Sequence, residues 1–557
     1  MRTLRRRILV PALAVLAGAA SVQGQSMDAA IERIMARPEF THSFFGIALV
    51  DLQTGKAVYR VNGAKFFMAA STTKLLTVGT ALHYLGADYR FHTRVYRTGP
   101  IAADGTLEGD LVLVASGDAN LSGRIRPDGT LAFMDDDHSY GGPPVAGDPL
   151  LVIRELAAQA AGKGIKRIRG RVLVDASLFP SGDREGGTQV VISPVVVNDN
   201  VIDIVVTPGA QPGAPATVAV SPFTSYLRLT AKVATGEPGS ASTGDFTADA
   251  ANPDGTRAVT LTGTVPAGGR PVYVPYAVPD PVRFAAIVFT EALHERGIVC
   301  APAQANETPD FAALSAAYTD AALVAEHVSP PFSEDAKVTL KVSQNLHASM
   351  LPYVLSAVVA KKPAPQAGFD LEREWLLSGK LDVSGAAQGD GAGAHGHFSP
   401  DFMTSYLAFV AAQPWYPAFF AALPVLGKDG TLADIQVKSP AAGQVHAKTG
   451  TFDEDDLLNA SDLVTAKALG GYFTRADGKR YAFAVFLNRV DVKGPGAVTR
   501  VAGQTVGEIA AALPAALEVF EKHHIDYYEE RNVPFREACR VSGVSEEEIL
   551  EEVRRLA

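Results

Sequence analysis

The chain has 557 residues, of which 47% are hydrophobic, and this exceeds what one hydrophobic core usually organises. We therefore expect two or more domains. The formal net charge of -10 provides no broad basic field, so nucleic acid is excluded as an expected partner.

Residues 1–24 have the pattern of an export signal, with an arginine-rich start, an apolar run over residues 8–20 and a small and polar end at Gly24. The apolar run is shorter than the roughly 20 residues that span a membrane, so a retained anchor is the weaker alternative. We expect a periplasmic or secreted protein, with peripheral membrane association open and the oligomeric state unassigned. Cys300 and Cys539 indicate neither a disulfide framework nor a metal site.

Two apolar runs, residues 44–50 and 57–61, flank a short polar segment, and this pattern predicts two strands joined by a turn. After Ser71 the apolar residues follow helical spacing until about Gly86, which predicts an amphipathic helix. Ser71 is therefore expected at the start of a helix.

Residues 96–328 are rich in glycine, proline and threonine and contain short strand-like runs at 111–114, 171–174 and 201–206. Residues 207–269 are especially poor in helix formers and dense in turn residues. We predict an inserted domain II made of residues 96–206 and 273–314, and a small β domain III made of residues 207–272.

Helix and strand patterns resume after the insertion. The expected elements are a helix over residues 333–359, a strand over 445–447 that leads into Lys448, a hairpin formed by 467–474 and 481–488, and a helix over 498–513. Elements on both sides of the insertion predict one discontinuous domain, made of residues 25–95 and 315–513.

Three short motifs carry the chemical signal: Ser71-Thr72-Thr73-Lys74, Ser343-Gln344-Asn345 and Lys448-Thr449-Gly450. Helix positions three apart share a face, so Lys74 can place its amine beside the Ser71 hydroxyl. A serine hydroxyl becomes a good nucleophile when a base removes its proton. A lysine can be that base if burial or a nearby positive charge lowers its pKa, and Lys448 could supply such a charge.

The other motifs can complete an acyl-transfer site. Ser343 and Asn345 point to one side if the backbone is extended, and could pass protons and hold a substrate amide. Lys448 and Thr449 could bind a carboxylate, while Gly450 leaves room for a substrate backbone. The backbone N–H groups of Ser71 and Thr451 are the expected oxyanion-hole donors, a role worth about 3 kcal/mol per donor.

Each motif alone occurs by chance in many proteins, so the order and the structural context of the three decide the interpretation. Ser343 follows Ser71 by 272 positions, and Lys448 follows Ser343 by 105. With these motifs the chain resembles penicillin-binding proteins and serine β-lactamases. The long insertion is similar to that of the D-alanyl-D-alanine carboxypeptidase/endopeptidase family of low-molecular-mass (class C) penicillin-binding proteins. Further similar segments are residues 116–118, 172–177, 197–200, 343–350 and 429–432.

The resemblance implies an α/β (α+β) fold of the transpeptidase type, with an antiparallel sheet flanked by helices. It also implies an enzyme without a cofactor that attacks the D-Ala-D-Ala amide of peptidoglycan stem peptides, or a peptide cross-link, through an acyl-enzyme on Ser71. Lys74 would be the base and Ser343 would relay a proton to the leaving amine. Penicillins and other β-lactams would acylate the same serine.

The resemblance further implies that an acid of the inserted domain reads an amino group of the stem peptide, and Asp175 is the candidate. The alternative is a strand-end carboxylate that caps a turn. Relatives often have Asp-Gly-Ser-Gly-Leu-Ser-Arg before a Ser-Pro pair, whereas residues 390–397 here lack that Ser and Arg. The histidines of this segment, His395 and His397, lack the further ligands that a metal site needs.

Four acids at residues 453–456 follow the third motif. They could attract an amine-bearing substrate, or form a solvated turn, which is the commoner outcome for such a charge run.

Residues 514–557 lie outside that family and suggest a small helical module. The segment resembles the N-terminal module of iron-sulfur-cluster repair proteins, but it has Tyr527-Tyr528 where that module has cysteines. Two alternatives to a DD-peptidase remain: a catalytically silent peptidoglycan-binding scaffold and a β-lactamase-like hydrolase. The nucleophile and base argue against the first, and the long insertion argues against the second.

Overall fold

The computed structural model describes residues 27–303, 309–459, 461–492 and 549. The chain divides into two compact units, the first made of Met1–Phe45, Thr451–Lys467 and Leu487–Ala557, and the second of Gly46–Gly450 and Ala468–Phe486. The predicted export signal, the predicted helix over 498–513 and, apart from Ile549, the C-terminal module lie outside the described residues. Within the described part of the chain, every helix is too short or too polar to cross a membrane.

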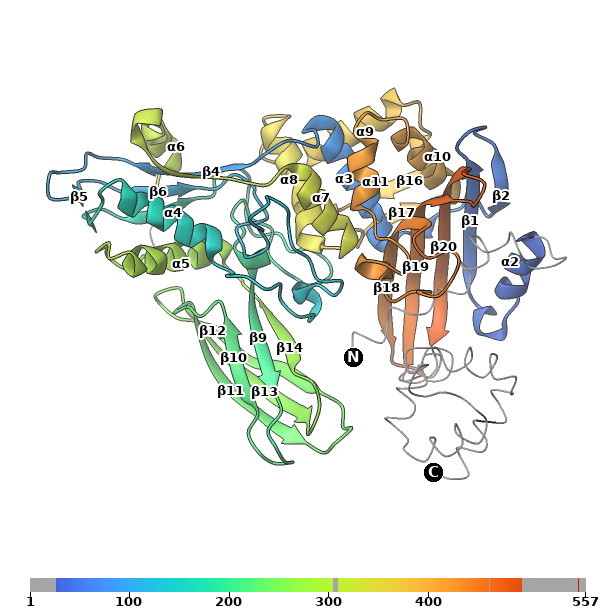
Figure 1. Cartoon of the computed structure of the whole chain (residues 1–557), viewed down its shortest axis with the longest axis horizontal. Helices are drawn as coiled ribbons and strands as arrows, with labels where there is room; N and C mark the ends of the chain where they lie inside the picture. The colour runs from blue at the N-terminus through green and yellow to red at the C-terminus, as the bar shows by residue number, and fades with distance from the viewer. Residues whose placement is uncertain (1–26, 304–308, 460, 493–548, 550–557) are drawn as a thin grey trace. The chain divides into compact units, whose positions relative to one another are not determined.

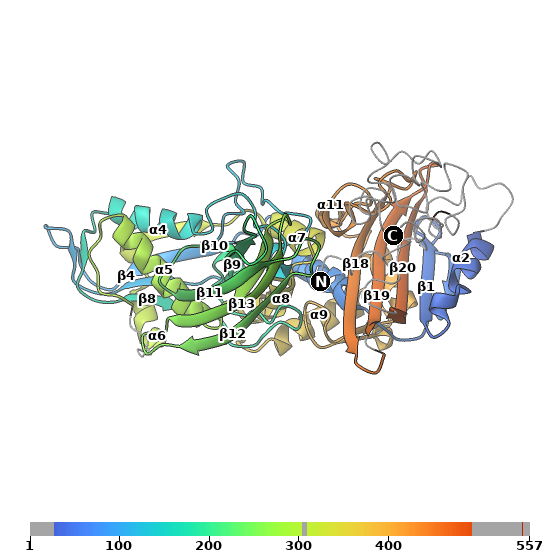
Figure 2. The same ribbon diagram turned by 90° about the horizontal axis from the view of Figure 1, so that it is seen from below.

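A five-stranded sheet has the order β18-β19-β20-β1-β2 (Figures 1 and 2). Its strands are β1 (Phe44–Asp51), β2 (Ala57–Val61), β18 (Val445–Asp456), β19 (Ser461–Thr474) and β20 (Arg480–Val492). β1 and β2 pair antiparallel, with Ile47 opposite Val61, as the sequence predicts. The predicted hairpin is also confirmed, because Gly478 turns the chain between β19 and β20 with a φ of 80°. The four acids at 453–456 continue β18, so the expected turn there is wrong.

A buried helix follows this first hairpin. It is α3 (Lys74–Tyr84), entered through the 3-10 turn η3 (Ala70–Thr73), and every residue from Lys74 to Leu82 is buried. Leu75, Leu76, Val78 and Leu82 lie in one hydrophobic cluster with aromatic side chains from its neighbours. The other helices of this part are α7 (Phe332–Lys341), α8 (Asn345–Val358), α9 (Gln366–Ser378), α10 (Pro400–Val410) and α11 (Tyr416–Ala422).

The predicted continuous helix over 333–359 is wrong, because the chain breaks between α7 and α8. Ser343 has a left-handed φ of 65°, and Gln344 caps α8 by accepting the Leu346 N–H at 2.9 Å. A left-handed non-glycine residue cannot continue an α-helix. The break places the second motif at a helix start.

The remaining strands and helices have the following bounds: α2 (Met27–Met35), β3 (Phe67–Met68), β4 (His92–Arg97), β5 (Thr106–Leu107), β6 (Leu111–Val114), α4 (Leu151–Gly162), β7 (Arg167–Ile168), β8 (Val172–Asp175), β9 (Val201–Thr207), β10 (Thr217–Ser221), β11 (Leu227–Gly236), β12 (Thr243–Ala251), β13 (Arg257–Pro266), β14 (Val272–Ala277), α5 (Pro281–Glu295), α6 (Phe311–Leu314), β15 (Leu323–Val328), β16 (Ala386–Gln388) and β17 (Gly396–Phe398).

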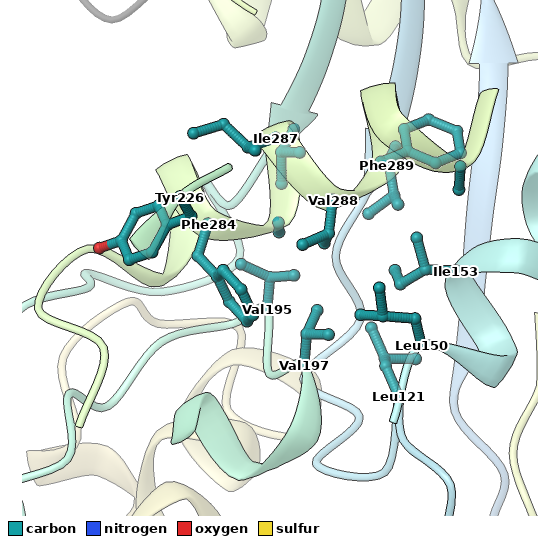
Figure 3. Packing of buried hydrophobic residues seen from close by; sticks show 14 of the residues in the cluster. Leu121, Leu150, Ile153, Val195, Val197, Tyr226, Phe284, Ile287, Val288 and Phe289 are labelled. Atoms are coloured by element: carbon teal, nitrogen blue, oxygen red, sulfur yellow. The ribbon is translucent and has the colours of Figure 1, made fainter. Parts of the chain in front are cut away.

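The region between the first and second motifs contains three larger sheets, with the orders β15-β4-β6-β8, β10-β9-β14 and β11-β13-β12. The predicted runs at 111–114, 171–174 and 201–206 are confirmed as β6, β8 and β9 to within a residue. Two helices, α4 and α5, lie beside the first of these sheets. A hydrophobic core joins these elements, and Figure 3 shows part of it: Leu121, Leu150, Ile153, Val195, Val197, Tyr226, Phe284, Ile287, Val288 and Phe289.

Candidate active site

Ser71 and Lys74 meet at the start of α3. The Lys74 side chain is fully buried, and its Nζ donates to Ser71 Oγ at 2.7 Å, to Asn345 Oδ1 at 2.7 Å and to the Ala392 carbonyl at 3.1 Å. The first two contacts join residues of two predicted motifs. Residues 271 positions apart in the sequence therefore converge on one amine.

Burial lowers the pKa of Lys74 to about 7. Glu185 and Asp390 oppose this shift because their negative charges favour the ammonium form. Burial, one of the two causes that the sequence allowed, is the largest cause of this lowered pKa. The pKa of this amine therefore lies near neutral pH, well below that of an ordinary lysine.

The turn that presents Ser71 is tightly confined. Ala70, just before the serine, has a left-handed φ of 45°, a conformation that costs about 1–3 kcal/mol in a non-glycine residue. Gly393 packs against this turn, since a Cβ on it would come within 1.9 Å of the Ala70 carbonyl oxygen. Gly396 has equally little room, because its Cβ would lie 2.2 Å from Thr73 Oγ1.

The Asp390 carboxylate shapes the loop that supplies the Ala392 carbonyl. One oxygen accepts the backbone N–H groups of Ala392 and Gly393, and the other accepts that of His395 at 2.6 Å. This loop is the segment that lacks the Ser and Arg of relatives.

The third motif lies on β18 with Lys448 fully buried. Its Nζ donates to the Thr449 carbonyl at 2.8 Å, and the Thr449 hydroxyl donates to Thr431 Oγ1 at 2.8 Å. Strand positions two apart share a face, so Lys448 and Gly450 point the same way. A Cβ on Gly450 would lie 3.1 Å from the Ser71 nitrogen and 2.6 Å from the Ala69 carbonyl oxygen. The motif therefore runs beside the Ser71 backbone.

Thr451 belongs to the other compact unit, where its hydroxyl accepts from Lys467 Nζ at 2.7 Å. Its expected N–H donation to an oxyanion stays a prediction.

Ser343 and Asn345 are placed differently from the extended arrangement expected from their spacing. Asn345 is the first residue of α8 and reaches Lys74, whereas Ser343 lies at the left-handed break and is half-buried. The proposed proton relay through Ser343 stays a prediction.

Asp175 ends β8 and is buried. One of its oxygens accepts the Ser177 N–H at 3.0 Å, and the other accepts the Tyr318 hydroxyl at 2.8 Å. These contacts match the strand-end alternative, a carboxylate that caps a turn. Its proposed contact with a substrate amine stays a prediction.

Glu185, a buried acid in the loop that leads from β8 to β9, is near the site although no motif in the sequence predicts it there. Its carboxylate accepts the backbone N–H groups of Gly187 and Thr188. A Cβ on Gly187 would lie 2.2 Å from Asn345 Nδ2, so the loop is packed against the second motif. The two glycines that follow Glu185 indicate that the backbone packs closely against another segment, but the sequence does not identify that segment.

One buried group among the described residues has metal-like spacing, namely Asp137, His138 and Asp199, whose ligand atoms lie within 4.8 Å of one another. Arg124 lies between its two acids, and its Nη2 donates to Asp137 at 2.5 Å and to Asp199 at 2.6 Å. The guanidinium therefore supplies the positive charge that a metal ion would bring. His395 is not a member of this group.

Residues 27–504 match a family model described as "D-Ala-D-Ala carboxypeptidase 3 (S13) family". The match spans most of the chain and contains all three motifs. The chain belongs to this family. A second family model, described as "Domain of Unknown function (DUF542)", matches residues 502–557, in agreement with a separate C-terminal segment.

Curated relatives of this S13 chain agree with the assignment. A "D-alanyl-D-alanine carboxypeptidase" of an Actinomadura species is 28% identical over 524 residues, which cover 90% of this chain and 88% of the relative. The "D-alanyl-D-alanine carboxypeptidase DacB" of Haemophilus influenzae is 24% identical over 457 residues, which cover 80% of this chain and 85% of the relative.

The solved structure of penicillin binding protein 4 (dacB) from Haemophilus influenzae superposes with a TM-score of 0.61 at 21% identity, over 82% of this chain and 92% of that one. Its complex with a novel β-lactam gives a TM-score of 0.59 at 20% identity, over 81% and 91%. The predicted fold class is confirmed by this likeness. The family match confirms the predicted enzyme class, a serine-type D-Ala-D-Ala carboxypeptidase.

Proposed function

We propose that Ser71 is the nucleophile of this S13 carboxypeptidase and that Lys74 is its general base, acting on the D-Ala-D-Ala end of peptidoglycan stem peptides. The observation that carries the proposal is the buried Lys74 amine, which reaches the Ser71 hydroxyl at 2.7 Å. A base needs both that distance and a pKa near the working pH, and this lysine has both.

The neutral form of Lys74 fits its three partners. A neutral amine has two N–H groups and one lone pair, and two of its neighbours, Asn345 Oδ1 and the Ala392 carbonyl, can only accept. The two N–H groups are directed to these oxygens, so the lone pair is left facing the Ser71 O–H. In this form the amine can accept the serine proton over the 2.7 Å that separates Nζ from Ser71 Oγ.

Acyl transfer then proceeds in two steps. Ser71 Oγ attacks the carbonyl carbon of the penultimate D-Ala while its proton passes to Lys74, and the C–N bond breaks as the terminal D-Ala amine takes up a proton. Water next attacks the acyl-enzyme and releases the shortened peptide with Ser71 restored. The Ser71 N–H can stabilise the oxyanion, and the missing side chain of Gly450 lets the strand lie close to this backbone.

The remaining roles are assigned by motif. Ser343 returns a proton to the leaving amine, and Lys448 with Thr449 binds the terminal carboxylate. The Thr449 hydroxyl is held by its hydrogen bond to Thr431 Oγ1. Asp175 is the candidate for the amino group of the stem peptide.

The compartment and the partners follow from the same proposal. Peptidoglycan lies outside the cytoplasm, and the arginine-rich, apolar pattern of residues 1–24 supports export to the periplasm or beyond. β-Lactams should bind this chain as substrate mimics, in line with the β-lactam complex of penicillin binding protein 4 from Haemophilus influenzae.

The test is covalent labelling. The purified chain is incubated with a fluorescent penicillin, the labelled peptide is mapped by mass spectrometry, and Ser71→Ala is the control. We expect one adduct on Ser71 and none in the variant. Equal labelling of both proteins, or an adduct elsewhere, would overturn the assignment, and release of D-alanine from a stem pentapeptide checks the carboxypeptidase reaction itself.

A further inference from the structure

A short turn of the inserted region holds the backbone of the second motif. The turn is formed by residues 137–140 and includes the 3-10 helix His138–Tyr140. The Tyr140 hydroxyl donates to the Ser343 carbonyl at 2.6 Å. This bond restrains the peptide group of Ser343, the motif residue that has a left-handed conformation.

The same turn also binds the middle residue of the motif. Gln344 is almost fully buried, and its Nε2 donates to Asp137 Oδ1 at 3.0 Å and to Ser139 Oγ at 3.1 Å. Its Oε1 accepts the Leu346 N–H, so every polar atom of the Gln344 amide side chain is engaged. Gln344 thereby ties the start of α8 to the turn.

The turn is itself held in a buried charge network. Asp137 accepts from Arg124, which also donates to Asp199, and Asp199 accepts from His347 Nε2 at 2.8 Å. His347 lies on α8, two positions after Asn345. The turn and the helix that carries Asn345 are therefore joined through both side-chain and charge contacts.

We propose that Tyr140 and Gln344 are positioning residues for acyl transfer, which set where Ser343 and Asn345 stand relative to Lys74. A non-glycine residue stays in a left-handed conformation only where contacts with its surroundings hold it there. The hydrogen bonds of Tyr140 and Gln344 supply that restraint for Ser343. Since Asn345 Oδ1 is one of the acceptors that direct the Lys74 lone pair at Ser71, a shift of the motif misdirects the base. The proposal rests on the function proposed above.

The experiment compares two tyrosine variants in the full chain. Tyr140→Phe removes the bond to Ser343, and Tyr84→Phe is the matched control, because the Tyr84 hydroxyl likewise donates to a backbone carbonyl, that of Leu371, at 3.0 Å. Acylation by a reporter penicillin is followed by stopped flow, giving a rate constant and a burst amplitude. A third variant, Gln344→Glu, keeps the oxygen that caps α8 but replaces the donor that faces Asp137.

We expect the acylation rate constant to fall about tenfold in Tyr140→Phe and further in Gln344→Glu, with the burst amplitude unchanged, and to stay within twofold in Tyr84→Phe. A lower amplitude with an unchanged rate constant would mean a purely structural role and would overturn the proposal, as would equal losses in both tyrosine variants. Absence of acylation in the unmodified chain would instead overturn the proposed function, a result that needs no variant to be recognised.

Discussion

Two buried regions of this S13 carboxypeptidase shift the pKa values of their basic side chains in opposite directions. Around Lys74 the direct partners are neutral dipoles, and burial lowers the pKa of the amine to about 7. The charge network also includes His138, which lies between Asp199 and Asp203, while His347 lies between Asp199 and Asp335. Burial opposes the cationic form of both histidines, but these carboxylates outweigh it and raise their pKa values to about 10 and about 9. Burial alone therefore does not decide whether a basic group is charged. Its hydrogen-bond partners decide it, since carboxylates stabilise the cation and neutral dipoles do so less.

The two regions also differ in what their carboxylates contact. Two acids lie near Lys74, but Glu185 and Asp390 turn their oxygens to backbone N–H groups and do not pair with the amine. The acids of the network, in contrast, are paired directly with cations. The carboxylates near the proposed base and those of the charge network thus differ in which groups donate to their oxygens.

The largest expected effect is the loss of the base. Lys74→Met should reduce the acylation rate by about 10²–10⁴-fold, the range typical of a general base, because its amine is the group that contacts the Ser71 hydroxyl. The thermal midpoint should change little, because the partners of the amine are neutral dipoles. Stopped-flow acylation and calorimetry measure the two quantities, and Lys56→Met, at an exposed turn, is the control. Full activity in Lys74→Met would refute the assignment.

The next effect concerns the network. Asp199→Asn should lower the free energy of unfolding by about 3–5 kcal/mol, because it leaves buried cations under-compensated. Asparagine tolerates the left-handed φ of 55° at this position, so the backbone is preserved. Denaturant titration measures the change. Asp401→Asn, which breaks the exposed pair with Arg60, should cost less than about 1 kcal/mol, and equal costs would contradict the comparison.

Alkaline pH should weaken the network by an amount on the order of a few kcal/mol. Both histidine pKa values are raised above the ordinary 6.5, so their stabilisation is complete below pH 6.5, declines as pH rises and is gone above about 9 for His347 and about 10 for His138. The thermal midpoint should therefore fall between pH 6.5 and 10, and less steeply in His347→Gln. A midpoint independent of pH over this range would show that the histidines are not cationic in the fold.

The smallest effect tests the acids near Lys74. The charge of Glu185 raises the pKa of Lys74, so Glu185→Gln should move the acid limb of the acylation rate to lower pH by less than about one unit. Asp183→Asn is the matched control, since Asp183 lies in the same loop but bonds to the Tyr353 hydroxyl. A shift to higher pH, or the same shift in both variants, would contradict the account.

Local spacing predicted the parts of the site that one helix or one strand supplies. Ser71 and Lys74 meet because they are three apart at a helix start, and Lys448 and Gly450 share a face because they are two apart on a strand. Local spacing did not predict the position of Asn345. That position depends on a break between α7 and α8, whereas the apolar pattern of 333–359 predicts one continuous helix. The Ala392 carbonyl, Glu185 and Tyr140 escaped prediction because long-range packing, and no local pattern, brings them to the site.

We propose that burial makes Lys74 a base at neutral pH, and the decisive measurement is the pH dependence of acylation of the unmodified chain. The rate constant for the Ser71 adduct, measured from pH 5 to 10 with a penicillin that does not titrate in this range, should rise through a single acid limb near pH 7. A limb near 10, where an ordinary lysine loses its proton, would contradict the account, and so would a rate that does not change with pH.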